Sequence, residues 1–343
     1  MKRIGFIGTG WTDIGQIKSF KKSGLIPQAI FSRSLQKAQK IADKYGILEV
    51  YTDWKDLIKS EKVDLISIVV PTWLHSDIIE YVREFDKHFI CEAPFMSVAE
   101  AVDLIDNKKE SNLEIIDYEL RFTPHFRKVK EIIASNYIGK IISFDFKYEN
   151  NFALDNDVLW DWSNDASLGG GYLRLVGGHF IDLAHWLFGE VGKIIHSEFD
   201  FSYKERIGKQ GNREKITADD YALIKMQYTN EIRGKILVSQ MSDKENDLHF
   251  LIEGTNGKIK INSLNELYIK NEKHGSFRKI DLAYDQSLFT GFDDNLFSIG
   301  TYFLGKDIIK YFKNGDYNFP TLEDALKNQK IIDEAYKTLP KND

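Results

Sequence analysis

Two glycines near the N-terminus stand where a protein can bind a phosphate group. Gly8-Thr9-Gly10 follows the apolar segment 4–7 and precedes a segment with helical periodicity, 11–22. The first glycine permits a tight turn, the second lets the backbone approach a pyrophosphate, and the helix N-terminus offers N–H groups and a positive dipole end. The position of the pair at a strand–helix junction is the context that a dinucleotide site requires. The residues we assign to this phosphate site are Gly8, Thr9, Gly10, Trp11 and Thr12.

The third glycine of the usual G-x-G-x-x-G fingerprint is replaced by Asp13. Two explanations are open: the helix packs slightly farther from the strand, or Asp13 caps the helix. In either case a carboxylate near a pyrophosphate is mildly unfavourable.

The residues at the end of the second strand indicate which of the two nicotinamide cofactors, NAD or NADP, is bound. An NAD site usually carries an acidic residue about 20 positions after the glycines, which bonds the ribose 2′-hydroxyl. Here the strand ends in Ser32-Arg33-Ser34, without a carboxylate. An arginine can pair with a 2′-phosphate, and serines can donate hydrogen bonds to it. We therefore expect NADP, with NAD as the second choice; the alternative is that Arg33 is a surface arginine at the start of a helix.

A second segment lies where ligands bind in open α/β sheets. Val70-Pro71-Thr72 leaves the apolar strand 64–70 at its carboxyl end, which is the edge of the sheet that receives the ligand. We add Val70, Pro71 and Thr72 to the cofactor site. His75 opens the next helix, and it is either a cofactor contact or a capping or structural histidine.

Strands and helices alternate over the first 118 residues. Strands are expected at 3–7, 29–31, 64–70, 88–91 and 114–118, with helices at 11–22, 35–45, 76–85 and 98–107. The segment DLISIVV is almost continuously apolar, as in a strand that is buried on both faces. This alternation predicts parallel βαβ units and an α/β Rossmann domain over residues 1–121.

The pattern changes after Arg121. One helix is expected at 126–135, and segments of alternating polarity follow at 141–148, 221–228, 235–239, 250–253 and 258–261. Such segments predict a mainly antiparallel sheet with one covered face. Helices are expected again at 296–312 and 322–338. We therefore predict a second, α+β domain over residues 122–343, built on a large open sheet.

Composition excludes several classes of protein. The chain has 343 residues, 43% of them hydrophobic and 29% charged, with a net charge of −6, which suits two soluble globular domains. An acidic chain is a poor partner for nucleic acid or an anionic membrane, because either needs a basic surface. Cys91 is the single cysteine, and no His, Asp or Glu cluster has metal-ligand spacing, so we expect no metal. The start MKRIGFIGTG lacks a signal-peptide pattern, and we expect a cytoplasmic protein.

The chain resembles the Gfo/Idh/MocA oxidoreductases over almost its whole length. The resemblance is carried by eight segments in the same order and spacing: IGFIGTG, SRSLQKAQKIADKYG, VDLISIVVPTWLH, KHFICEAP, RFTPHFRKVKEIIASNYIGKI, GGGYLRLVGGHFIDLAHWLFGE, LIEGTNGKIKI and FPTLEDALKNQKIIDEAYK. It implies an NAD(P)-dependent enzyme that acts on a sugar, sugar nucleotide or polyol. It also implies a homodimer or homotetramer formed through the sheet of the second domain.

Two positions depart from the pattern of this family. Members usually carry Glu-Lys-Pro after the fifth strand, and the lysine approaches nicotinamide and substrate; here the segment is Glu92-Ala93-Pro94. Members also usually carry an aspartate four residues before a histidine, and Leu175 stands in that place before His179. By resemblance, Glu92 and Ala93 belong to the cofactor site. Alanine and leucine cannot move a proton.

His179 is the best remaining acid/base residue, because its pKa lies near working pH and the resemblance places it beside the nicotinamide. The alternative is a half-buried structural histidine. Candidate substrate contacts are Tyr118 and Arg121 after the sixth strand, Trp160 and Trp162 before the glycines, Arg174, and Asp182 three residues after His179. The tryptophans can stack on a sugar ring or pack in the core, and Arg174 can bind an anionic group.

Three functions remain open on this sequence. The first is hydride transfer on a sugar-like substrate with His179 as the only acid/base residue. The second is a cofactor-binding sensor on the same scaffold, since some relatives are regulatory proteins. The third, a hydrolase or lyase that uses a transiently reduced cofactor, has no residue in its favour.

Overall fold

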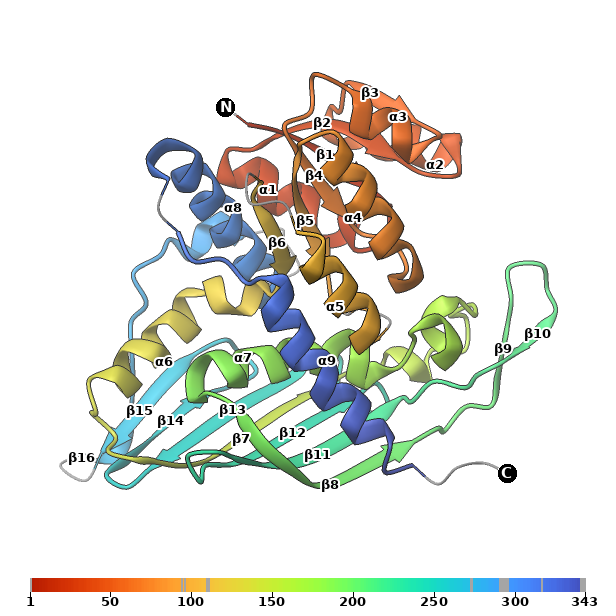
Figure 1. The fold of residues 1–343 in the computed structure, drawn as a ribbon. Coiled ribbons are helices and arrows are strands. Elements are labelled where there is room, and N and C mark those ends of the chain that lie inside the picture. Colours follow the sequence, from red (N-terminus) through yellow and green to blue (C-terminus); the bar gives the residue numbers. More distant parts are fainter. Residues whose placement is uncertain are drawn as a thin grey trace. The chain divides into compact units, whose positions relative to one another are not determined.

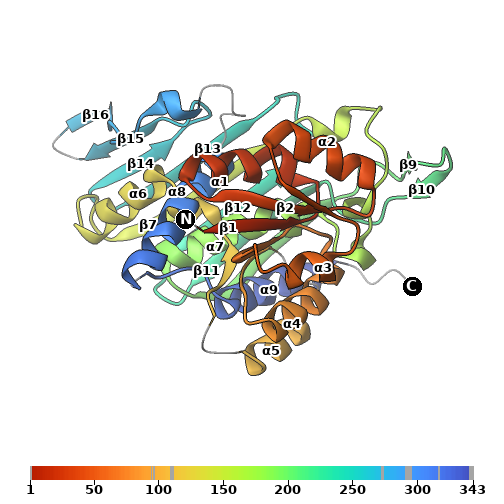
Figure 2. The same cartoon turned by 90° about the horizontal axis from the view of Figure 1, so that it is seen from above.

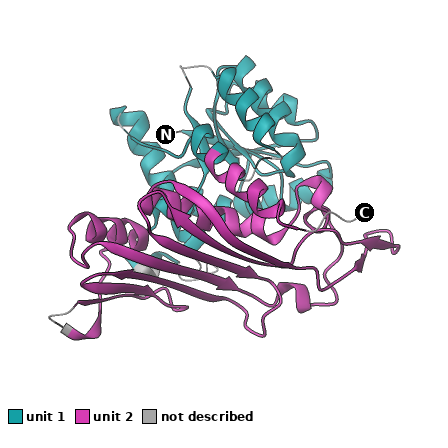
Figure 3. Cartoon of the chain, turned by 60° about the horizontal axis from the view of Figure 1, so that its bottom comes forward, with its two compact units in different colours: residues 1–123, 285–326 teal, residues 124–284, 327–343 magenta. Residues whose placement is uncertain are grey.

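The computed structural model describes residues 2–93, 95, 97–108, 112–271, 274–289, 296–315 and 317–339. The chain forms two compact units (Figures 1 and 3). Unit 1 consists of Met1–Thr123 and Asp285–Leu326, and unit 2 of Pro124–Tyr284 and Lys327–Asp343.

Unit 1 is built on a six-stranded sheet with the order β3-β2-β1-β4-β5-β6. The strands are β1 (Arg3–Ile7), β2 (Ile26–Phe31), β3 (Glu49–Tyr51), β4 (Leu65–Ile68), β5 (His88–Glu92) and β6 (Glu114–Asp117). Every pairing is parallel. This is the strand order of the doubly wound dinucleotide-binding fold, so the predicted fold class is confirmed for this unit. The short strand β3 was not expected from the sequence.

Helices cover both faces of this sheet. They are α1 (Ile17–Ser23), α2 (Leu35–Tyr45), α3 (Trp54–Lys59), α4 (His75–Glu84), α5 (Val98–Asp106) and α8 (Leu296–Asn314). Figure 2 shows α1 and α2 on one face and α3 and α4 on the other. Alternate strand residues divide accordingly: Leu65 packs with α1, α2 and α8, whereas its neighbour Ile66 packs with α3, α4 and α5. Side-chain caps fix the helix starts, as at α2, where the Ser34 hydroxyl accepts a hydrogen bond from the Lys37 N–H.

The segment 285–326 lies in unit 1, although the sequence analysis placed it in the second domain. Helix α8 packs on α1, where the Ser19 hydroxyl donates to the Ser298 carbonyl at 3.0 Å. The same C-terminal segment also contacts the sheet: the Ile116 N–H of β6 donates to the Pro320 carbonyl at 3.0 Å. A C-terminal segment therefore completes the N-terminal unit, an arrangement that local sequence patterns do not reveal.

Unit 2 contains an eight-stranded sheet with the order β16-β15-β14-β13-β7-β12-β11-β8. The strands are β7 (Ile141–Glu149), β8 (Val191–Asp200), β11 (Tyr221–Tyr228), β12 (Arg233–Ser239), β13 (Asp247–Gly254), β14 (Gly257–Ile261), β15 (Leu267–Asn271) and β16 (His274–Lys279). Only the β7–β12 pairing is parallel, so the mainly antiparallel sheet is confirmed. A separate two-stranded arm is formed by β9 (Glu205–Ile207) and β10 (Arg213–Lys215).

Helices α6 (Pro124–Ala134) and α7 (Gly178–Phe188) cover one face of the large sheet (Figure 1). The last helix, α9, spans Leu322–Tyr336. Aromatic contacts fix α7 on the sheet: Phe188 stacks on Phe144 of β7 at 4.7 Å, and Phe180 meets Phe250 of β13 at 5.4 Å between ring centroids. The helix that carries His179 is thereby anchored at both ends by buried rings. Among the described residues, no helix is long and apolar enough to cross a membrane.

Candidate functional site

The glycine turn at the end of β1 fits a pyrophosphate. Gly8 has φ +114°, and a Cβ there would lie 1.9 Å from the Val69 carbonyl oxygen, so no other residue fits. At the exposed Gly10 a Cβ would meet no protein atom within 4 Å. The backbone conformation and the Val69 carbonyl thus require a glycine at position 8, whereas Gly10 leaves open space beside the turn. Together they form the cradle that a dinucleotide phosphate needs.

The helix after the turn begins with a wider, π-helical segment, Thr12–Gln16, that continues into α1. The Trp11 ring covers Gly15, where a Cβ would lie 2.4 Å from Trp11 Cζ2. The Thr12 side chain is fully buried. With these two side chains packed inward, backbone N–H groups are what this segment offers to a ligand. The sequence analysis missed the packing role of Gly15, although a glycine two residues after Asp13 was a visible signal.

Asp13 does not cap the helix; it pairs with a cation. Its carboxylate lies 2.7 Å from the Lys44 ammonium on α2. Partial burial opposes ionisation of Asp13, but hydrogen bonds that involve Lys44 and Tyr45 outweigh it and hold the pKa of Asp13 below its usual value. Lys44 therefore compensates the charge that the sequence marked as unfavourable near a pyrophosphate.

The segment that follows β2 contains one exposed charged side chain, Arg33. Ser32 is buried, and the Ser34 hydroxyl caps α2 by accepting from the Lys37 N–H at 3.3 Å. Arg33 is exposed, and within the described chain its guanidinium forms no hydrogen bond or ion pair. Arg33 is thus the side chain of this segment that remains available to a bound anion.

The segment after β4 is held by His75. This histidine is 1% exposed, its Nε2 lies 2.9 Å from the Val70 carbonyl oxygen, and its ring meets Phe95 edge-on. Thr72 is also 1% exposed, whereas Val70 and Pro71 are partly exposed. His75 consequently ties the start of α4 to the end of β4. Its burial favours the structural interpretation over a direct cofactor contact.

Two carboxyl groups meet at the carboxyl ends of β5 and β6. The Gln16 side-chain amide donates to Glu92 Oε1 at 2.6 Å and to Asp117 Oδ2 at 2.9 Å, and its oxygen accepts from the Ser67 hydroxyl at 2.5 Å. Gln16, Ser67 and Asp117 are fully buried. Burial, followed by the charges of Asp117 and Glu119, raises the pKa of Glu92 well above its usual value. Glu92 therefore keeps its proton at pH values where an isolated glutamate is ionised.

We expect Glu92→Gln to stabilise the protein at pH 8 and to have little effect near pH 4. Because the folded-state pKa is raised, the native protein holds a proton that the unfolded chain has lost above the usual pKa. The wild-type free energy of unfolding therefore falls as pH rises from about 4.5 towards the folded pKa, by at most about 1.4 kcal/mol per pH unit. Urea unfolding at several pH values measures this difference. The control is Glu80→Gln on the exposed side of α4, and an equal pH slope in wild type and Glu92→Gln would contradict the raised pKa of Glu92.

The remaining predicted residues of unit 1 are engaged in its interior. Ala93 packs against the buried hydrophobic cluster that lies between the sheet and helices α3, α4 and α5. Tyr118 is 2% exposed in the same cluster. The Arg121 guanidinium lies 3.3 Å from the Asp324 carboxylate, with only 11% of its side chain exposed. Tyr118 thus has a packing role that the sequence analysis did not weigh for it.

In unit 2 a glycine-rich turn leads into the helix of His179. Gly171 has φ +122°, and a Cβ there would lie 2.3 Å from the buried carboxylate of Asp219. The backbone then forms a second π-helical segment, Leu173–Gly177, which continues into α7. His179 lies in the first turn of α7 and is 7% exposed. Both helices that follow the glycine turns of this chain therefore begin in the same widened geometry.

Asp182 lies on α7 in a hydrogen-bonded network with α9. The Asn328 amide donates to Asp182 Oδ1 at 3.0 Å, and its oxygen lies 2.6 Å from His185 Nδ1. Asp182 and Asn328 are each 1% exposed. This burial makes Asp182 a residue that orients α7. The sequence analysis missed Asn328 and His185, because the contact joins segments 146 residues apart.

Arg174 and the tryptophans are also held by neighbours within unit 2. The Arg174 guanidinium lies 4.2 Å from the Tyr336 ring centroid and donates to the Gly170 carbonyl at 3.0 Å. The Trp160 indole N–H donates to the Lys215 carbonyl at 3.0 Å. Trp160, Trp162 and Leu175 are partly buried. The described residues contain no group of three His, Cys, Asp or Glu side chains that could hold a metal ion.

Comparisons with known proteins agree with both halves of this picture. A family model described as "Oxidoreductase family, NAD-binding Rossmann fold" matches residues 2–116, and one described as "GFO/IDH/MocA C-terminal domain" matches residues 126–260. The chain belongs to the Gfo/Idh/MocA oxidoreductase family.

Curated relatives are about 25% identical to this Gfo/Idh/MocA protein over the aligned residues. An uncharacterized oxidoreductase of Synechocystis is 25% identical, over 79% of this chain and 74% of its own. Levoglucosan dehydrogenase of Pseudarthrobacter phenanthrenivorans is 25% identical over 69% of this chain, and the match spans 65% of that protein. The solved structure of levoglucosan dehydrogenase with NADH superposes with a TM-score of 0.85 at 21% identity, covering 98% of this chain and 96% of that one. This last likeness establishes the fold.

Proposed function

We propose that this chain is an NADP(H)-dependent oxidoreductase that transfers a hydride to or from a sugar, sugar nucleotide or polyol. The observation that carries the proposal is the glycine turn, in which Gly8 is forced by the backbone and Gly10 leaves open space. When bound, the nicotinamide cofactor supplies the hydride acceptor or donor. Membership of an oxidoreductase family supports the reaction type, and levoglucosan dehydrogenase, by its name a sugar-type enzyme, supports the substrate class.

The chain's own residues have separate roles in this proposal. Backbone N–H groups at Thr9–Thr12 would hold the pyrophosphate, and Arg33 would hold the 2′-phosphate. His179 moves the proton of the substrate hydroxyl. Arg121, Trp160, Trp162 and Arg174 are the proposed substrate contacts. Tyr118 and Asp182 are left out of the contact set because their side chains are at most 2% exposed.

We expect the protein to bind NADPH more tightly than NADH and Arg33→Ala to remove the preference. Charge-assisted hydrogen bonds to a phosphate are worth about 1.5–3 kcal/mol, which corresponds to a preference of roughly 10- to 100-fold. Fluorescence titration of both cofactors measures it. Arg233→Ala, which removes an exposed arginine of unit 2, is the control; equal affinities in the wild type would refute the role of Arg33.

A panel of sugars, sugar phosphates and sugar nucleotides with NADP⁺ and NADPH tests the proposal, read at the nicotinamide absorbance. Turnover of at least one compound supports it. A silent panel together with tight cofactor binding favours a cofactor-binding sensor instead. The observation behind that second candidate is the loss of both usual proton carriers, at Ala93 and Leu175.

The same proposal includes an assembly. We expect a homodimer or homotetramer formed through the large sheet of unit 2, as the family resemblance implies.

A further inference from the structure

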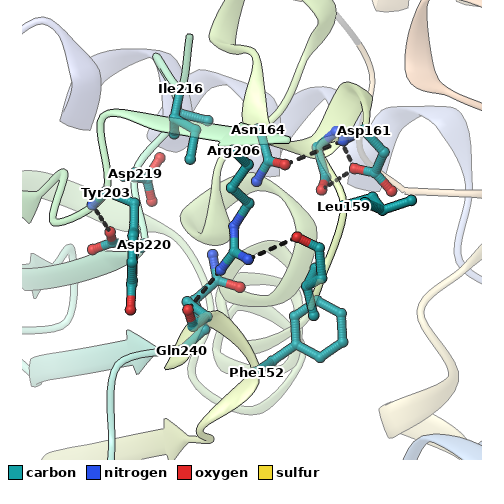
Figure 4. Close-up of a pocket in the computed structure, with 14 residues that line it drawn as sticks. Phe152, Leu159, Asp161, Asn164, Tyr203, Arg206, Ile216, Asp219, Asp220 and Gln240 are labelled. Atoms are coloured by element: carbon teal, nitrogen blue, oxygen red, sulfur yellow. Dashed lines mark hydrogen bonds between the residues drawn. The ribbon is translucent and has the colours of Figure 1, made fainter. Parts of the chain in front are cut away.

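Unit 2 contains a pocket that involves none of the residues discussed above as acid/base or substrate contacts (Figure 4). It lies between the segment 152–164, the β9–β10 arm, the start of β11 and Gln240, and its volume is about 60 Å³. His179, Arg174 and Asp182 are not among its lining residues. It is therefore a candidate site in its own right.

The charged groups of the pocket build its walls. Arg206 is 9% exposed, and its guanidinium donates to the carbonyls of Asp155 and Val158, each at 2.9 Å. The Asp220 carboxylate accepts from the Ser202 N–H at 2.7 Å and from its hydroxyl at 3.0 Å. These hydrogen bonds fix the shape of the pocket, because each holds a loop segment in place.

Neutral polar groups remain available inside these walls. Within the described chain, the Gln240 amide and the Tyr203 hydroxyl form no hydrogen bond, although both side chains line the pocket. Figure 4 shows both among the residues that surround Arg206. Apolar side chains complete the lining: Phe152 is 58% exposed and Leu159 is 46% exposed. The lining thus includes an amide, a phenol and an aromatic ring.

We propose that this pocket binds the end of a neutral, hydroxyl-rich molecule, such as a sugar or a cyclic polyol. Amide and phenol groups both donate and accept, as vicinal hydroxyl groups require. A volume of about 60 Å³, room for roughly two waters, admits two adjacent hydroxyl groups while the C–H face rests on Phe152. Three carboxylates, Asp161, Asp219 and Asp220, line the pocket against the single Arg206. The lining therefore disfavours an anion.

The pocket wall is joined to the turn that precedes His179. The Ser163 carbonyl accepts from the Gly171 N–H at 3.1 Å, and Asp219 accepts from the Leu173 N–H at 2.9 Å. Trp160 and Trp162 flank the lining residues Asp161 and Ser163 in sequence. Occupation of the pocket should consequently change tryptophan fluorescence. The binding does not depend on hydride transfer and is measured without cofactor.

Titration with myo-inositol, D-glucose and D-gluconate, by calorimetry and tryptophan fluorescence, tests the site. We expect the two neutral polyols to bind and D-gluconate to bind at least several-fold more weakly. Gln240→Ala should raise the Kd for the neutral polyols about tenfold, and Tyr203→Phe should weaken binding in the same direction. Gln210→Ala, an exposed glutamine on the β9–β10 connection outside the pocket, should leave the Kd unchanged.

Three outcomes would overturn the proposal: no binding of either neutral polyol, tighter binding of D-gluconate, or an unchanged Kd in both Gln240→Ala and Tyr203→Phe. Thermal unfolding of each variant shows that it is folded before titration. The pocket is tested by the Kd of Gln240→Ala and Tyr203→Phe without cofactor, and the oxidoreductase activity by turnover with cofactor, so failure of one is distinguishable from failure of the other.

Discussion

Replacing His179 by alanine should lower kcat on an accepted sugar substrate by about 10²–10⁴-fold. His179 is the proton carrier of the proposed reaction, since the side chains of Ala93 and Leu175 cannot carry a proton. Its position also suits the role, because α7 is fixed by the rings of Phe180 and Phe188 and by the Asp182–Asn328 hydrogen bond. A side chain on a rigid helix loses little entropy on reaching a reactive geometry.

The measurement separates proton transfer from binding. Steady-state kinetics should show the loss in kcat, while the Kd for NADPH changes less than about threefold, since the glycine turn follows β1 in unit 1 and His179 belongs to unit 2. His196→Ala on the exposed strand β8 is the matched control. An activity in His179→Ala within about twofold of wild type would assign this histidine a structural role, and the search for the acid/base residue would move to the Glu92–Asp117 pair.

The fold of unit 1 was predictable because its signals are local. Each expected strand and helix depends on a short apolar run, a periodicity or a cap, such as Ser34 before α2 and Gly46 after it. The positive φ of Gly8 follows from the same local chemistry. The family model that covers residues 2–116 confirms the resulting fold class.

Long-range contacts were not predictable from the same signals. Gln16, Glu92 and Asp117 meet only because β1, β4, β5 and β6 are adjacent in the sheet, and nothing near Gln16 marks it as a partner of Asp117. The packing of segment 285–326 in unit 1 has the same character. The hydrogen bonds of Asn328 are also long-range, because Asn328 lies 146 residues after Asp182 and 143 residues after His185 in the sequence.

Glu114→Gln should destabilise the protein by about 3–5 kcal/mol, because it breaks a buried ion pair. Arg83 Nε lies 2.7 Å from Glu114 Oε1, and Nη2 lies 2.7 Å from Oε2, in a two-point contact. The two side chains are 4% and 1% exposed. Arg83 Nη1 also donates to the Leu104 carbonyl at 2.9 Å, so this one guanidinium joins α4, α5 and β6. A loss of that size is a large share of the roughly 5–15 kcal/mol that stabilises an ordinary domain.

The double variant Arg83→Met, Glu114→Leu distinguishes two causes of the destabilisation: loss of the attraction between Arg83 and Glu114, and burial of the Arg83 charge without a partner. If the cost of Glu114→Gln comes mainly from leaving the guanidinium buried without a counter-charge, removing both charges should restore most of the lost free energy of unfolding. Urea denaturation of the wild type, the single variants and the double variant completes the cycle. Glu131→Gln, in the exposed Lys128–Glu131 pair of α6, should change stability by less than about 1 kcal/mol. If Glu114→Gln lowers the free energy of unfolding as little as Glu131→Gln does, water reaches Arg83, and the Arg83–Glu114 pair does not hold β6 against α4 and α5.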